Sequence, residues 1–236
     1  LYLPCVCLLS VQALKTLPSG TAGERTTSTN QHSTQFLALY LVHAVCHLVF
    51  VQFKPGPAHD KMLMSLHHVV SLVAFGINFV SGRWHYWAVL DGLCETTGIF
   101  VNNLHLMKHL RIDSARLNAA NGALLWGSWV VCRLCLFSWW LWTWFADNKW
   151  RYKVTAQNAS SHPLEAYGLY VAPASNLLLL AMSAHWFVPI HRGFAKALAA
   201  LAAERATDGA AADEAADGAA DGAGAAEDAA AKGAVD

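Results

Sequence analysis

Long apolar segments recur along the chain, and their length limits the folds that it can adopt. The hydrocarbon core of a bilayer is about 30 Å thick, so a helix needs about 20 apolar residues to cross it. Six candidate segments lie near residues 1–14, 36–53, 62–81, 84–105, 122–146 and 164–190. The sequence therefore predicts an all-α, polytopic membrane protein with about six transmembrane helices.

Composition and charge indicate the same fold class. Hydrophobic residues make up 55% of the 236 residues, charged residues make up 14%, and there are ten tryptophans. These proportions are typical of membrane proteins. The net charge is zero, but nine of the 16 acidic residues lie between Glu204 and Asp236, so the chain before them is basic. Basic loops suit a surface that faces anionic lipid head groups.

Three regions follow from this pattern. The chain does not begin with Met, and we interpret residues 1–33 as a clipped first transmembrane helix and its loop. Residues 34–195 form the predicted transmembrane domain. Residues 196–236 are rich in Ala, Gly and acids, and no large apolar residue follows Leu201 except Val235. Because little apolar surface offsets the entropy of ordering this region, we expect a disordered, low-complexity acidic tail.

An acid and two histidines interrupt the third apolar segment, which reads HDKMLMSLHHVVSLVAFGINFV at residues 59–80. Successive residues of a helix are about 100° apart around its axis. One stripe of the predicted helix therefore holds Asp60, His67, Ser71 and Asn78. His68 lies a quarter-turn away from this stripe.

The fourth apolar segment carries a second polar stripe, formed by Asp91, Glu95 and Asn102. Only a few residues separate it from the third segment, so we expect the two helices to form a tight hairpin. An ionisable residue in a span costs about 2.5–3.5 kcal/mol on insertion scales, so the two stripes should face each other or a common polar-lined cavity. Asp91 and Glu95 are one turn apart and would repel as like charges. One of them is therefore expected to be protonated or bound to a histidine.

These side chains suggest acid–base chemistry, because a neutral histidine beside a carboxylate is an arrangement that general bases use. The predicted catalytic residues are His67, His68, Asp60, Asp91 and Glu95. The predicted substrate-binding residues are Ser71, Asn78 and Asn102. The alternative is a hydrogen-bonded polar seam that only locks the hairpin.

Further histidines raise the question of a metal. His43 and His47 form one HxxxH pattern, and His105 and His109 form another. Such patterns occur in membrane di-iron desaturases and hydroxylases, where several imidazoles hold two irons. Those families also use HxxHH boxes, which do not occur here, so no residue is assigned as a metal ligand. The six cysteines likewise show no CxxC pair with matching histidines, so neither a zinc site nor a disulfide framework is indicated.

Orientation in the membrane depends on two features near the end of the fifth segment. Tryptophan favours the interface between lipid and water, so the run from Trp139 to Trp150 is interpreted as an interfacial belt. Asn158-Ala159-Ser160 is a candidate glycosylation acceptor. If the acceptor is used, this side is lumenal and the C-terminus is cytosolic.

Three stretches together resemble a known family. HDKMLMSLHHVV is followed by LDGLCETTGIFVNNLHLMK and preceded by YLVHAVCHLVF. This ordered set, over roughly residues 34–192, resembles the TLC-domain membrane proteins, which include ceramide synthases, TRAM-like translocon proteins and lipid-regulating proteins.

The resemblance to ceramide synthases implies transfer of an acyl group from acyl-CoA to a sphingoid amine. It makes His67 and His68 the catalytic pair, Asp60 the acid that precedes them and Asp91 the first acid of the next helix. Two positions depart from the ceramide synthase pattern: Cys94 stands where those enzymes carry a second Asp, and Leu90 where they carry His. The stretch Glu95-Thr96-Thr97 is similar to the TLC proteins that are not known to make ceramide.

The resemblance therefore implies a membrane protein that binds or regulates lipids. The alternatives are an acyl-CoA-dependent lipid N-acyltransferase of the ceramide synthase type and, less well matched, a di-iron desaturase or hydroxylase. The expected partners are the bilayer and a membrane lipid or acyl chain, with no nucleic acid and no cofactor besides acyl-CoA as a co-substrate. We expect the endoplasmic reticulum or another endomembrane, with the plasma membrane as the alternative.

Overall fold

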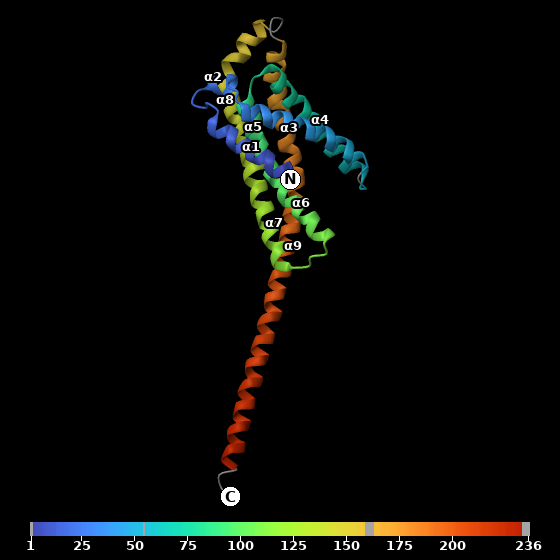
Figure 1. Cartoon of the computed structure of the whole chain (residues 1–236), viewed down its shortest axis with the longest axis vertical. Helices are drawn as coiled ribbons and strands as arrows, with labels where there is room; N and C mark the ends of the chain where they lie inside the picture. The colour runs from blue at the N-terminus through green and yellow to red at the C-terminus, as the bar shows by residue number, and fades with distance from the viewer. Residues whose placement is uncertain (1, 54, 159–162, 233–236) are drawn as a thin grey trace.

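The structure is a computed structural model that describes residues 2–53, 55–158 and 163–232. Side chains are described for residues 2–53, 55–149, 151, 164 and 168–209. Every regular element in these ranges is helical (Figure 1). In chain order, the elements are α1 (Tyr2–Thr16), α2 (Ala22–Thr27), α3 (Gln31–Phe53), α4 (Ala58–Ser81), α5 (His85–Gly92), η1 (Leu93–Glu95), α6 (Thr96–His109), α7 (Ala115–Trp129), η2 (Val130–Cys135), α8 (Leu136–Asn158) and α9 (Pro163–Lys232).

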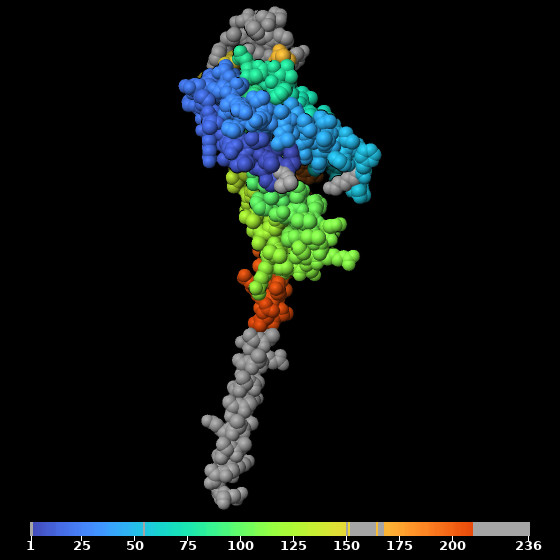
Figure 2. Space-filling view, in the orientation of Figure 1, coloured from blue at the N-terminus to red at the C-terminus, as the bar shows by residue number. Residues whose placement is uncertain are grey.

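Four helical stretches in the described ranges are long and apolar enough to cross a bilayer. They are Gln31–Phe53, Ala58–Ser81, Ala115–Lys149 and Gly168–Gly209. The outer faces of α3 and α4 carry exposed large apolar side chains, and Figure 2 shows these two helices at the surface. The predicted helical membrane architecture is confirmed, and the chain is an integral membrane protein.

The predicted number of six spans is not confirmed. Helix α1 is apolar but has 15 residues, fewer than the roughly 20 that a span requires. The segment predicted as one span over residues 84–105 is divided into α5, the 3₁₀ helix η1 and α6. The division follows Gly92, where an added Cβ would meet the Phe36 ring and lie 2.7 Å from the Ser10 hydroxyl. The missing side chain thus lets this segment approach α1 and α3 closely.

The 3₁₀ helix changes which residues share a face. It has about 3.0 residues per turn in place of 3.6, so every side chain after it is rotated relative to a continuous α-helix. Glu95 is buried, but Asn102 is exposed. The predicted common face of Asp91, Glu95 and Asn102 is wrong for Asn102, because α6 packs mainly against α7 and α1, and these neighbours leave Asn102 at the surface.

The arrangement of α4 also differs from the predicted hairpin. Helix α4 packs mainly against α3 and α9, whereas α5 packs mainly against α1, α2 and α3 (Figure 1). The connection between α4 and α5 contains two left-handed residues, Gly82 with φ 62° and Trp84 with φ 58°. The sharp turn directs α5 away from the face of α4, so the two polar stripes do not run along one hairpin.

Tryptophans form part of the core, not only a belt. Trp84, Trp87, Trp140 and Trp144 are almost fully buried and pack in one cluster. The rings of Trp140 and Trp144 are stacked, with centroids 4.8 Å apart. The predicted belt is thus wrong for these two residues, whose positions one turn apart on α8 turn them toward α5. Trp139 and Trp142 are exposed, as a belt requires, and the side chain of Trp150 lies outside the described residues.

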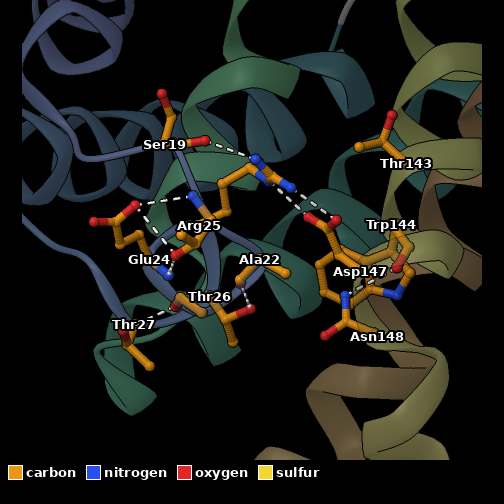
Figure 3. A network of polar contacts seen from close by, with 12 residues as sticks. Ser19, Ala22, Glu24, Arg25, Thr26, Thr27, Thr143, Trp144, Asp147 and Asn148 are labelled. Carbon is orange, nitrogen blue, oxygen red and sulfur yellow. Dashed lines mark hydrogen bonds and ion pairs between the residues drawn. The ribbon is translucent and has the colours of Figure 1, made fainter.

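An ion pair joins the short helix α2 to α8 (Figure 3). Nε of Arg25 donates to Oδ2 of Asp147 at 2.6 Å, and Nη2 donates to Oδ1 at 2.7 Å. Thr21 and Glu24 cap the start of α2 by reciprocal hydrogen bonds. The Asp147 carboxylate raises the pKa of Arg25 through this hydrogen bond, while desolvation opposes the change. The loop after α1 is therefore fixed beside this end of α8.

Helix α9 continues beyond the other helices to Lys232 as a single element (Figure 1). The predicted disorder of the tail is not confirmed, and its many alanines favour helix. Near the bundle, Arg116 of α7 forms exposed ion pairs with Glu204 at 3.9 Å and Asp208 at 3.6 Å. The candidate glycosylation acceptor at residues 158–160 lies outside the described side chains.

Candidate functional site

Helix α4 buries most of the polar stripe that the sequence predicts. His67, Ser71 and Asn78 are each at least nine-tenths buried. Asp60 is different: its side chain is 70% exposed and lies 3.5 Å from Nδ1 of its neighbour His59. The stripe therefore enters the bundle from His67 onward, and the structure does not bring Asp60 to it.

His68 is buried as well, although it lies off the stripe. The reason is α3, which covers this side of α4. Nδ1 of His47 on α3 lies within 2.6 Å of Nε2 of His68, so the two imidazoles share a hydrogen bond.

Four histidines form a group between α3 and α4. The ring centroids are 4.6 Å apart for His47 and His68, 5.0 Å for His67 and His68, and 5.4 Å for His43 and His47. The Tyr2 ring of α1 stacks on His43 at 3.7 Å. Sequence reasoning did not assign His43 and His47 to the site, although their spacing of four places both on one helix face. In the part of the chain that the structure describes, no group of three or more His, Cys, Asp or Glu side chains is arranged to hold a metal ion.

The two buried acids have different neighbours. Nδ2 of Asn176 on α9 donates to Oδ1 of Asp91 at 2.9 Å. Glu95 lies beside the Cys94 thiol, with 3.9 Å between Sγ and Oε1, and its charge interacts with that of Arg133. Among the described residues, no hydrogen bond or ion pair joins either acid to a histidine, so that alternative is not observed, and protonation of one acid stays a prediction. Asn176 was missed because a lone amide in an apolar segment gives no periodic signal.

Arg133 is the second residue that sequence reasoning missed. It lies within the span Ala115–Lys149, in the π-helical segment η2, and is 8% exposed. Its Nε donates to Oγ1 of Thr97 at 2.9 Å, and its guanidinium carbon lies 4.7 Å from the centroid of the Trp129 ring. The available signal was the arginine itself, since a cation inside an apolar segment is costly and commonly functional.

The polar groups from four elements meet near Glu95. The Tyr40 hydroxyl on α3 lies against Ser71 and interacts with the charge of Glu95. Arg133 lies close enough to Glu95 and His67 to influence both groups electrostatically. We call His67, Ser71, Glu95, Arg133 and Tyr40 the central polar site.

Several buried polar atoms on α1, α4 and α9 have no hydrogen-bond partner among the described residues. They include Nδ1 of His67, Nδ1 of His68, Oδ1 of Asn78, Oδ1 of Asn176, the Ser10 hydroxyl and the Tyr2 hydroxyl. Because hydrocarbon offers no hydrogen bonds, such atoms are costly unless water or a ligand satisfies them. Together they offer both donors and acceptors to a polar group.

A cavity of about 560 Å³ lies elsewhere, between α6, α7 and α9. Its walls are mostly apolar and include Leu104, Leu125 and Phe194, with Asp113 and Lys196 also among the lining residues. This cavity contains no residue of the central polar site, so it is not the polar-lined cavity that the two stripes predict.

A helical bundle with apolar outer faces and imidazole, carboxyl and guanidinium groups inside defines an integral membrane protein with a buried polar centre. A family model described as the TLC domain matches residues 5–192, and the chain belongs to this family of membrane proteins associated with lipids. Neither the comparison with curated proteins nor the comparison with solved structures gives a match.

Proposed function

We propose that this protein binds a membrane lipid with its polar group at the central polar site, and that it regulates membrane lipid composition in this way. The observation that carries the proposal is the set of unpaired buried polar atoms around His67 and Asn78. A lipid would bring oxygen atoms to these donors and acceptors, and its acyl chain would contact the apolar side chains of the bundle. The polar contacts would lower the cost of keeping these polar groups inside a membrane.

Ser71 and Asn78 are proposed to contact the polar part of the lipid, because both are buried on the same face of α4 as His67. The exposed Asp60 and Asn102 are not part of this proposal. We propose the endoplasmic reticulum or another endomembrane as the location, in keeping with the resemblance to ceramide synthases and translocon proteins.

The test uses purified protein and a lipid with a photoreactive group near its polar end. After illumination, we expect cross-links to peptides that contain His67 or Ser71, and we expect Ser71→Leu to reduce them because leucine fills the site. His109→Leu is the control, since His109 is exposed at the end of α6. Cross-links that are confined to the outer faces of α3 and α4 would contradict the proposal.

The hydrogen bond between His47 and His68 favours a second candidate, an acyltransferase that uses acyl-CoA. One imidazole of the pair His67 and His68 would take the proton of an amine or hydroxyl as that group attacks the thioester carbonyl, while the other would stabilise the developing oxyanion. The thiolate of coenzyme A would then leave and take up the proton. This candidate stands second because two positions depart from the ceramide synthase pattern. Cys94 stands where the resemblance expects Asp, and Leu90 stands where it expects His.

An assay with labelled acyl-CoA and lipid acceptors distinguishes the acyltransferase from a protein that only binds lipid. Turnover that is present in the parent, retained in His109→Ala and lost in His67→Ala would support the acyltransferase. No turnover by the parent, together with lipid cross-links to the central polar site, would support binding alone.

A further inference from the structure

Arg133 lies within a membrane span, at a local change of helix type. The span Ala115–Lys149 is α-helical except over Val130–Cys135, which is a π-helix. Short π-helical segments are rare and often occur at functional sites. A cation at this depth costs about 2.5–3.5 kcal/mol on insertion scales, so its presence requires a compensating interaction.

The contacts of Arg133 fix its orientation. Thr97 Oγ1 accepts from Arg133 Nε at 2.9 Å and donates to the carbonyl oxygen of Cys94 at 2.7 Å. The guanidinium lies over the Trp129 ring, and Nε1 of Trp129 donates to the carbonyl oxygen of Ser183 at 3.0 Å. The side chain is therefore held from α6 and α7, and α9 in turn holds Trp129, which limits the motion of the guanidinium before any ligand arrives.

These contacts use few of the five N–H groups of the guanidinium. Within the described ranges, the bond to Thr97 is the one hydrogen bond found for Arg133, and no carboxylate oxygen lies within 4 Å of it. Glu95 is near enough for its charge to interact with that of Arg133 but does not form an ion pair with it. A buried guanidinium without a direct counter-ion is open to a forked, bidentate bond with a planar or tetrahedral anion.

We propose that Arg133 binds the anionic group of an acyl lipid, a carboxylate or a phosphate, at the central polar site. The inference rests on the proposed lipid binding and adds the class of lipid. The anion would lie between Arg133 and His67, and Nδ1 of His67 is available to it as a further hydrogen-bonding atom. Thr97 is a positioning residue that directs the guanidinium.

The experiment measures equilibrium binding of four probes to the purified full chain in neutral detergent micelles. Oleate carries a carboxylate, oleoyl lysophosphatidate carries a phosphate, and oleyl alcohol and monoolein are neutral with comparable chains. We expect at least one anionic probe to bind the parent at least about tenfold more tightly than the neutral probes. The reason is that an anion can form two charge-assisted hydrogen bonds with the guanidinium, whereas a neutral group cannot. The anionic probe that shows the preference identifies a fatty acid or a phospholipid as the source.

Variants assign the preference to Arg133. Arg133→Met should remove it, Arg133→Lys should retain part of it, and Thr97→Val should weaken it while leaving the charge in place. Arg192→Met is the control, because Arg192 is exposed on α9. If Arg133→Met does not fold, as judged by thermal unfolding, the lysine and Thr97 variants carry the test.

Three outcomes are distinct. Loss of the anion preference in the Arg133 and Thr97 variants, but not in Arg192→Met, supports the site. Equal binding of anionic and neutral probes by the parent, or a preference that all variants retain, overturns the site and leaves the proposed lipid binding intact. Binding of none of the four probes by the parent overturns the proposed function and this site with it.

Discussion

Nδ1 of His47 lies 2.6 Å from Nε2 of His68, and this contact joins α3 to α4 inside the bundle. One of these nitrogens must donate and the other accept, so the tautomers of the two rings depend on each other. When Nε2 of His68 accepts, its proton lies on Nδ1, an atom without a partner among the described residues. The ring of His47 thus determines whether His68 offers a donor or an acceptor to a ligand.

Replacing His47 by Ala should destabilise the protein by about 1–3 kcal/mol, because His68 remains buried and loses its hydrogen-bond partner. Thermal unfolding of the purified variant in micelles measures this. His59→Ala is the matched control, since His59 is exposed and its contact with Asp60 lies at the surface. Equal melting temperatures for the two variants would show that the bond between His47 and His68 contributes nothing to stability.

The ion pair between Arg25 and Asp147 should stabilise the loop that connects α1 to α3. Both side chains are mostly buried and joined by two hydrogen bonds, so removing either partner should cost about 1–3 kcal/mol. A double-mutant cycle with Arg25→Ala and Asp147→Ala measures the coupling. Arg116 and Asp208 form the comparison pair, because both are exposed and should couple by less than about 1 kcal/mol. A coupling no larger than that of the comparison pair would refute the role of Asp147.

The sequence was sufficient to predict the helical membrane fold and part of the site. Hydropathy identified four stretches that the structure also presents as candidate spans. Within one continuous helix, a spacing of about 100° per residue grouped His67, Ser71 and Asn78, and all three are buried. Periodicity succeeds here because it describes the local geometry of a single helix.

Contacts between helices could not be derived in the same way. Asn176 bonds Asp91 across 85 positions and Arg133 bonds Thr97 across 36, and no local pattern encodes either pairing. The error at Asn102 also comes from packing between helices, because α7 and α1, the main neighbours of α6, leave this residue at the surface. Tertiary packing likewise decided that Trp140 and Trp144 are buried, against the preference of tryptophan for the interface.

Glu95→Gln should strengthen binding of the anionic probe that the parent prefers. Glu95 is the acid near Arg133, and an ionised carboxylate there would repel an incoming anion, whereas a neutral amide would not. We expect affinity to rise at least about threefold, since charges interact strongly away from bulk water. The neutral probes should bind as before. Asp113→Asn, an exposed acid outside the spans, serves as control, and weaker anion binding by Glu95→Gln would contradict the assignment.

Gly92→Ala should disrupt the close approach of α5 to its neighbours. The added methyl group would collide with the ring of Phe36 on α3 and lie 2.7 Å from the hydroxyl of Ser10 on α1. Phe36 is fully buried in the core beside Tyr40 and cannot move freely, so we expect a loss of about 1–3 kcal/mol of stability. Gly127→Ala is the control, because nothing lies within 4 Å of its added Cβ and alanine favours helix there. Thermal unfolding should show a lower melting temperature for Gly92→Ala and an equal or higher one for Gly127→Ala. If Gly92→Ala is as stable as the parent, the helix break after Gly92 does not depend on this close packing.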